Sequence, residues 1–98
     1  MPHAVVAIHK HPKETWPQQE PFLHERIIPM VKTMPGFLTG RWGIDRSQYQ
    51  SHSFVVFANE ADAGRLATFI QDEAKRPNPF GVELLSAKVV EVIGEAST

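Results

Sequence analysis

The segment Met34-Pro35-Gly36-Phe37 constrains the fold of this chain more than any other feature of the sequence. Pro35 ends an apolar segment of helical spacing, because the residue before a proline disfavours helical backbone angles. Gly36 allows a sharp turn, since glycine has no Cβ and reaches positive φ at little cost. Phe37 then opens an alternating run over residues 38–44 that is typical of a strand. The segment therefore predicts a helix that leads directly into a strand.

The rest of the chain predicts a regular order of elements around this junction. An apolar stretch at residues 4–8 suits a strand that is covered on both faces. Apolar residues recur every three to four positions between residues 18 and 34, and Pro29 within this helix should kink or split it. The other expected elements are a loop at residues 11–17, a turn at 46–50, a strand at 53–58, a helix at 60–75 and a strand at 82–93.

This order is the ferredoxin-like α+β pattern βαββαβ, a four-stranded antiparallel sheet with two helices on one face. The 98 residues predict a single domain, residues 1–98, with a core at about residues 3–93. If the second and third strands form a hairpin, the predicted faces are Leu38, Trp42, Ile44, Phe54 and Val56 on one side, and Phe37, Val55 and Phe57 on the other. Both faces are then apolar while the helices cover one. We therefore expect the open face to bind a second copy of the chain about a two-fold axis.

Composition excludes several classes of function. A formal net charge of -1 shows no basic excess that would indicate nucleic acid as a partner. No apolar stretch is long enough to span a membrane, and histidines interrupt the apolar runs at the start of the chain. The absence of cysteine excludes disulfides, thiolate catalysis and zinc sites built on cysteine. We expect a soluble, cytoplasmic domain.

The chain resembles the dimeric α+β barrel superfamily and, within it, the antibiotic-biosynthesis-monooxygenase-like (ABM) domains. The residues that carry the resemblance are Met34-Pro35-Gly36-Phe37, Trp42 in the second strand, and the passage from Phe57 into residues 59–63. The resemblance implies a homodimer whose two sheets form a barrel, with a small-molecule cleft between helices and sheet in each protomer. Active members oxidise aromatic polyketides without metal or flavin, or degrade heme, and many others have no assigned reaction.

Cofactor-free oxygenation needs a substrate that becomes an electron-rich anion, a base, hydrogen-bond donors for the anion, and a dry pocket. The candidate catalytic residues are Trp42 as an indole donor, His52 as a base near neutral pH, and Asn59 as an amide that binds a carbonyl. Each has a plainer interpretation that we favour. Trp42 suits a core or interface aromatic, His52 a solvent-facing strand residue, and Asn59 the N-cap of the second helix.

The candidate binding residues are His9, Arg41, Tyr49, Phe22 and Met34. Arg41 is alternatively an exposed ion-pair partner of Asp45 on the same face of the strand, and such pairs contribute little stability. Tyr49 is most simply a turn residue. Phe22 and Met34 belong to a bulky apolar set that either fills the predicted cleft as core or lines it.

His9-Lys10-His11 raises the question of a metal site, because alternate residues of a strand point to the same side. Glu20 and His24, one helical turn apart, form a second incomplete pair. Nothing in the spacing supplies a third ligand, so we expect solvent-facing histidines and no metal. No glycine-rich cofactor motif follows a strand, so we expect no cofactor.

Heme degradation is disfavoured within the family that the chain resembles. That branch places a tryptophan at the end of the third strand and a histidine on the following helix. The matching positions here are Ala58 and a helix without histidine. Two functions remain open: a cofactor-independent monooxygenase-like domain that acts on or binds a small aromatic or apolar molecule, and a non-catalytic homodimeric module for small-ligand binding or interaction.

Overall fold

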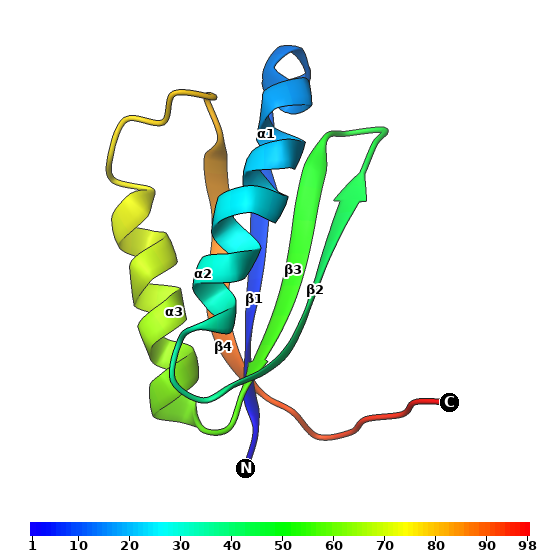
Figure 1. The fold of residues 1–98 in the computed structure, drawn as a ribbon, viewed down its shortest axis with the longest axis vertical. Helices are drawn as coiled ribbons and strands as arrows, with labels where there is room; N and C mark the ends of the chain where they lie inside the picture. The colour runs from blue at the N-terminus through cyan, green and yellow to red at the C-terminus, as the bar shows by residue number, and fades with distance from the viewer.

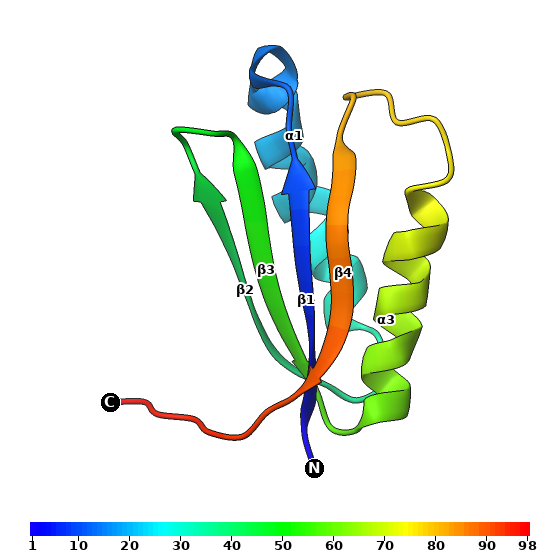
Figure 2. The same ribbon diagram turned by 180° about the vertical axis from the view of Figure 1, so that it is seen from behind.

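The computed structural model describes residues Met1–Thr98 and confirms the ferredoxin-like order of elements. The strands are β1 (His3–Lys10), β2 (Phe37–Asp45), β3 (Gln50–Phe57) and β4 (Glu83–Glu91). They form one antiparallel sheet in the order β2-β3-β1-β4, so β1 is central and pairs with both β3 and β4. The helices lie on one side of this sheet (Figure 1), and the opposite side is bare (Figure 2).

The first helical segment begins earlier than predicted and changes its winding along its length. Its parts are the 3-10 turn η1 (Lys13–Thr15), α1 (Trp16–Phe22), the π-helical segment η2 (Leu23–Ile27) and α2 (Ile28–Lys32). Pro17 fits the first turn of α1, where its missing N–H would have no helical partner. The interruption predicted at Pro29 is confirmed: just before it, the Ile28 N–H donates to the Leu23 carbonyl, five residues back. The wider π turn accommodates a proline that cannot donate.

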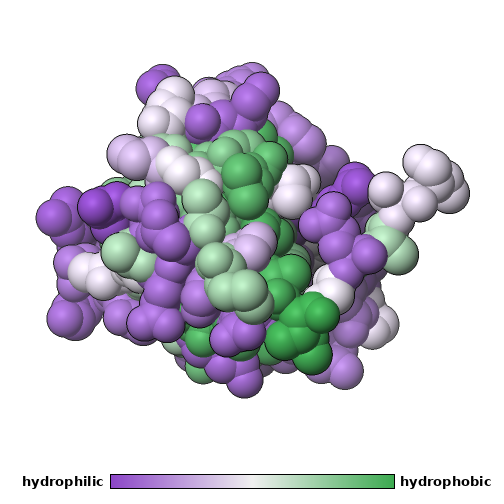
Figure 3. Space-filling model, turned by 90° about the horizontal axis from the view of Figure 1, so that it is seen from below, coloured by the Kyte–Doolittle hydropathy of each residue, from purple (hydrophilic) through white to green (hydrophobic).

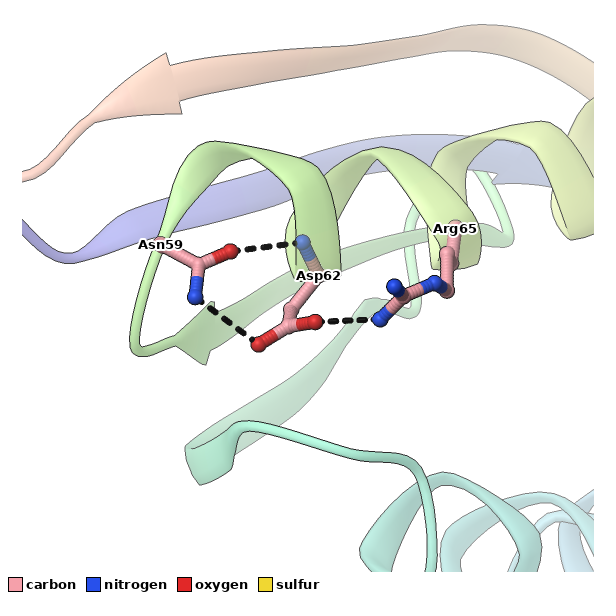
Figure 4. Close-up of polar contacts among 3 residues, drawn as sticks. All are labelled: Asn59, Asp62 and Arg65. Atoms are coloured by element: carbon pink, nitrogen blue, oxygen red, sulfur yellow. Dashed lines mark hydrogen bonds and ion pairs between the residues drawn. The ribbon is translucent and has the colours of Figure 1, made fainter.

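The second helix, α3 (Glu60–Glu73), begins at the predicted N-cap. The Asn59 side-chain oxygen accepts from the Asp62 backbone N–H at 2.9 Å, and its amide nitrogen donates to the Asp62 carboxylate at 3.0 Å. Asp62 also pairs with Arg65, so three side chains form one chain of polar contacts along the first turns of the helix (Figure 4). The amide and the carboxylate stabilise the helix start by satisfying a free N–H and by opposing the helix dipole.

The Met34-Pro35-Gly36-Phe37 junction packs against this same helix start. Gly36 has φ +81°, in the left-handed region, and its carbonyl accepts from the Ala58 N–H at 2.8 Å. The Asp62 carboxylate lies so close that a Cβ at position 36 would overlap it. The turn into β2 and the turn into α3 therefore form one packed unit, and glycine is required there both for its φ and for its lack of a side chain.

The core lies between the sheet and the helices and is small. Its buried members are Val5, Val31, Val55, Phe57, Ala63, Leu66 and Ala67. The backbone of α3 approaches β4, β1 and β3 closely, whereas the first helical segment reaches the core through side chains, chiefly Val31 of α2. In Figure 1, β2 and β3 lie to one side of α1 and α2, which run over β1 and β4. The helix-facing side of β2 is thus the least covered part of this layer.

The predicted distribution of side chains on β2 is wrong. Trp42 pairs with Ser53, and Ile44 pairs with Ser51, so both face the helices and not the open side with Phe54. The register is determined by a tight turn that ends at Tyr49, which has φ +52°, and by a β-bulge between Phe37 and Thr39. The apolar residues that the register leaves on the open face are Ala4, Val6, Ile8, Phe54, Val56 and Val90.

Replacement of Gly36 by alanine should destabilise the protein. Positive φ costs a non-glycine residue about 1–2 kcal/mol, and the added Cβ must also displace Asp62. The matched control is Gly64→Ala within α3, where an added Cβ meets nothing within 4 Å. Alanine there should stabilise the helix by about 0.5–1 kcal/mol. Urea unfolding measures both changes, and equal effects of the two substitutions would contradict the proposed packing of the junction.

Candidate functional site

A buried polar network joins the first helical segment to the sheet. Gln19 of α1 is the one buried polar residue of the chain. Its side-chain oxygen bonds the His11 Nδ1, and the His11 Nε2 lies 2.7 Å from the Ser51 hydroxyl on β3. The Gln19 amide nitrogen donates to the Thr15 hydroxyl at 2.7 Å. Because an amide oxygen can only accept, the His11 Nδ1 carries a proton and donates to Gln19. The network anchors the start of α1 above the ends of β1 and β3.

Aromatic side chains surround this network. The Trp16 ring makes edge-on contacts with His11 at 5.1 Å and with Tyr49 at 6.3 Å between ring centroids. The Trp16 indole N–H donates to the Glu20 carboxylate at 3.1 Å, and Arg46, in the turn after β2, lies 3.6 Å from the same carboxylate. Tyr49 is a turn residue, as predicted, and its carbonyl accepts from the His11 N–H at 2.9 Å. The β2–β3 turn is therefore tied to α1.

His9 faces the same layer from β1. It pairs with Ser51 in the sheet register, is half-buried, and makes no hydrogen bond within the chain. Burial lowers the pKa of His9 from its ordinary value of 6.5, and repulsion from His11 lowers it further. His9 is therefore a neutral imidazole at pH 7, with a nitrogen able to accept a proton.

Trp42 faces the helices from β2 and packs against the core next to Val55. This agrees with the interpretation of Trp42 as a core aromatic. Its indole N–H nevertheless makes no hydrogen bond within the chain, and the atom is not sealed from solvent. Trp42 is thus an apolar packing residue that retains a free donor.

The structure separates the three candidate catalytic residues. Trp42 faces the helices, His52 is exposed on the open face, and Asn59 caps α3. These three side chains therefore do not line one cavity of a single chain. A catalytic role for His52 stays a prediction that concerns the open face. The N-cap accounts for the contacts of both the oxygen and the nitrogen of the Asn59 side-chain amide.

The remaining candidate binding residues also lie apart. Arg41 is exposed on the open face and makes no ion pair with Asp45, whose carboxylate instead accepts from Ser47 in the turn. Those hydrogen bonds lower the pKa of Asp45. Met34 packs against the core. Phe22 is 42% exposed and makes an edge-on contact with Phe80, 5.6 Å between centroids.

Two hollows lie at the surface near the network. One, of about 370 Å³, runs along one side of α1 and is lined by Trp16, Pro17, Glu20, Pro21 and His24. The other, of about 260 Å³, is lined by Lys10, His11, Pro12, Gly81 and Glu83. Neither is lined by Trp42 or His52. The first is within the size range of small-ligand sites.

The chain holds no grouping of three or more His, Asp or Glu side chains that could bind a metal ion. His9 and His11 do lie on one side of the chain, with ring centroids 6.2 Å apart, but no third ligand joins them. None of the helices combines the length and the apolar character that crossing a membrane would require.

Comparison with known proteins agrees with the fold. No protein-family model matches the chain, and no curated protein matches it. Among solved structures, the chain is similar to the heme-degrader MhuD from Mycobacterium tuberculosis, solved with two hemes bound in its active site. The TM-score is 0.64 at 19% sequence identity, and the match covers 99% of this chain and 100% of that chain. The chain therefore has the ABM-like α+β fold that the sequence resemblance implied. At this identity the match shows the fold alone.

Sequence reasoning missed Gln19, Ser51 and Trp16. Residues 11–17 were expected to be a loop, and position 51 was expected only to border the third strand. Gln19 and Ser51 are linked through His11, which is 40 residues from Ser51 in sequence. The sequence did contain one signal. Gln19 lies among prolines at the start of a helix, and it follows His9 and His11 by at most ten residues.

The stability of the protein should depend on His9 in mildly acidic solution. Because the folded pKa lies below the unfolded value of 6.5, the unfolded chain binds more protons in the window between them. Stability is therefore lost as the pH falls from about 6.5 through the folded pKa of His9. Urea unfolding at pH 7.5 and 5.5 should show a smaller loss for His9→Gln than for the wild type. An equal loss of unfolding free energy in the wild type and in His9→Gln would show that folding does not hinder protonation of His9.

Proposed function

We propose that the protein is a homodimeric domain that binds a small aromatic or apolar molecule between its helices and the exposed part of β2, and oxygenates it without metal or flavin. The observation that carries this proposal is a pair of side chains in one layer that lack partners. Trp42 offers a free indole N–H, and His9 offers a neutral, half-buried imidazole. These are the two groups that cofactor-free oxygenation requires of a protein, a donor for an anion and a base.

The sheet register sets the separation of these two groups. Trp42 is on β2 and His9 is on β1, with β3 between them, and they lie in neighbouring rows of side chains. Two strand spacings of about 4.8 Å and a step of two residues put their Cα atoms on the order of 12 Å apart. The side chains between them are small, with Ser51 and Ser53 on β3 and Ala7 on β1. The Trp42 ring lies back over Gly40, on the side away from the His9 row, so a substrate that contacts both groups must reach further than this Cα separation.

The proposed chemistry balances without a cofactor. His9 removes a proton from an activated CH₂ group of the substrate, and Trp42 hydrogen-bonds the oxygen on which the negative charge develops. The carbanion gives an electron to O₂, and the two radicals combine to a peroxide. Loss of water from the peroxide leaves a carbonyl, so CH₂ and O₂ become C=O and H₂O. One oxygen atom enters the product, and the other leaves as water.

Trp42→Phe should lower oxygen consumption with anthrone-like or quinol substrates by about tenfold or more, since the loss of one such donor costs at least that much. An oxygen electrode with purified protein measures the rate. His52→Gln, on the opposite face of the sheet, should retain a rate close to that of the wild type. The reverse pattern, with His52 essential and Trp42 dispensable, would move the reaction to the open face.

One observation favours the non-catalytic alternative. The polar groups around the larger hollow already bond one another, as Trp16 does with Glu20 and Glu20 with Arg46. Such a site can hold a ligand without offering a free base. Calorimetric binding of aromatic probes with no oxygen uptake across a broad panel would establish the binding module and exclude the oxygenase.

The homodimer is proposed through the open face of the sheet. Phe54 is 42% exposed there, beside the row of valine and isoleucine side chains of β1. At the end of the molecule where the termini lie, hydrophobic residues also reach the surface, between hydrophilic flanks (Figure 3). A sheet face with an exposed phenylalanine beside apolar strand residues fits a second copy of the same sheet. A buried core of so few residues gains stability from such a partner.

Phe54→Asp should convert the dimer to a monomer. Each protomer would place one unpaired carboxylate in the interface, and burial of such charges is costly. The matched control is Phe69→Asp on α3, where the side chain is 38% exposed on the helical side. It should leave the assembly unchanged. Analytical ultracentrifugation at micromolar concentration measures the state, and a monomeric wild type would rule out the proposed dimer.

A further inference from the structure

Gly40 lies under the ring of Trp42. The two residues are on the helix-facing side of β2, two positions apart. A Cβ at position 40 would be 2.8 Å from both Cη2 and Cζ3, the far end of the Trp42 ring. Carbon atoms in contact prefer about 3.5–4.0 Å. The ring therefore lies back along its own strand, over a position that has no side chain.

The backbone gives no other reason for glycine at this position. Positive φ among the glycines occurs at Gly36 and Gly81, and Gly40 has the extended conformation of a strand. Glycine inside a strand lowers its stability, and at position 40 the structure shows a packing reason for it. The Trp42 ring is that reason, with Val55 Cγ1 at 3.6 Å from the same Cβ position completing the contact.

We propose that Gly40 is a positioning residue that holds the Trp42 ring down on β2 and thereby sets the direction in which its indole N–H is offered to the proposed ligand. This inference rests on the proposed function. Any side chain at position 40 forces the ring to another rotamer, away from the strand and toward the helical layer. The indole N–H then no longer points where it does in the wild type.

Gly43 supplies a matched control within the same strand. It lies on the other face of β2, opposite His52, and an added Cβ there would be 3.8 Å from the His52 carbonyl oxygen, an ordinary contact. Gly40→Ala and Gly43→Ala make the same chemical change in the same strand. They differ in whether the Trp42 ring is displaced.

The first test measures the ring itself. In ¹H–¹⁵N spectra of the full-length protein, Gly40→Ala should shift the indole resonance of Trp42, assigned by its loss in Trp42→Phe. Gly43→Ala should leave that resonance in place. Gly40→Ala should also lower the melting temperature, and the double variant Gly40→Ala/Trp42→Phe should recover part of the loss, because phenylalanine lacks the overlapping atoms. An unchanged indole resonance in Gly40→Ala, or no recovery in the double variant, would overturn the inference.

The second test measures the ligand. With an anthrone-like probe that the wild type binds, Gly40→Ala should weaken affinity about tenfold or more, since a misplacement of about 1 Å can cost a hundredfold in a positioned site. Gly43→Ala should bind as the wild type does. A shifted indole resonance with unchanged affinity would overturn the ligand part of the inference. If the wild type binds no probe, the proposed function fails with it, while the resonance shift still decides whether Gly40 positions the ring.

Discussion

The contact between Gly36 and Asp62 joins the two halves of the molecule. The first half contains the turn from α2 into β2, and the second half contains the turn from β3 into α3. The Ala58 N–H bonds the Gly36 carbonyl, while the Asp62 carboxylate lies over Gly36 and accepts from Asn59. The entry to β2 and the start of α3 therefore share one set of contacts. The positions of β2 and of its helix-facing side chains follow from this unit.

The order of elements was predictable because each boundary has its own local chemistry. Pro35 and Gly36 mark the end of the first helix, and Asn59 with Asp62 marks the start of the second, each through interactions within a few residues. The interruption before Pro29 follows from the missing N–H in the same local way. These signals operate over one turn of chain, so they can be read from the sequence without knowledge of the tertiary contacts.

The faces of β2 were not predictable for a physical reason. In a strand with apolar residues on both parities, hydrophobic alternation does not select a register, and a shift of one residue exchanges the two faces. Phe37 and Trp42 have opposite parity, yet the bulge between Phe37 and Thr39 places both on the helix-facing side. The positive φ of Tyr49 sets the hairpin, and nothing about a tyrosine signals it in advance.

The candidate site was hard to predict because its contacts are long-range. His11 bonds Ser51 across 40 residues, and the role of Gln19 depends on α1 lying over the end of β1. Trp42 was identified from the sequence, but its orientation depends on register. A tryptophan on the open face would be an interface residue, whereas on the helix side it packs against the core.

β2 combines weak intrinsic strand stability with exposure. It is an edge strand with β3 as its one neighbour, and it contains Gly40 and Gly43, which contribute no side-chain packing. Trp42 offsets this loss by packing against the core from between the two glycines. Substitutions at Gly40 or Trp42 therefore act at the edge of the sheet, whereas the central pairing of β1 with β3 and β4 depends on neither residue.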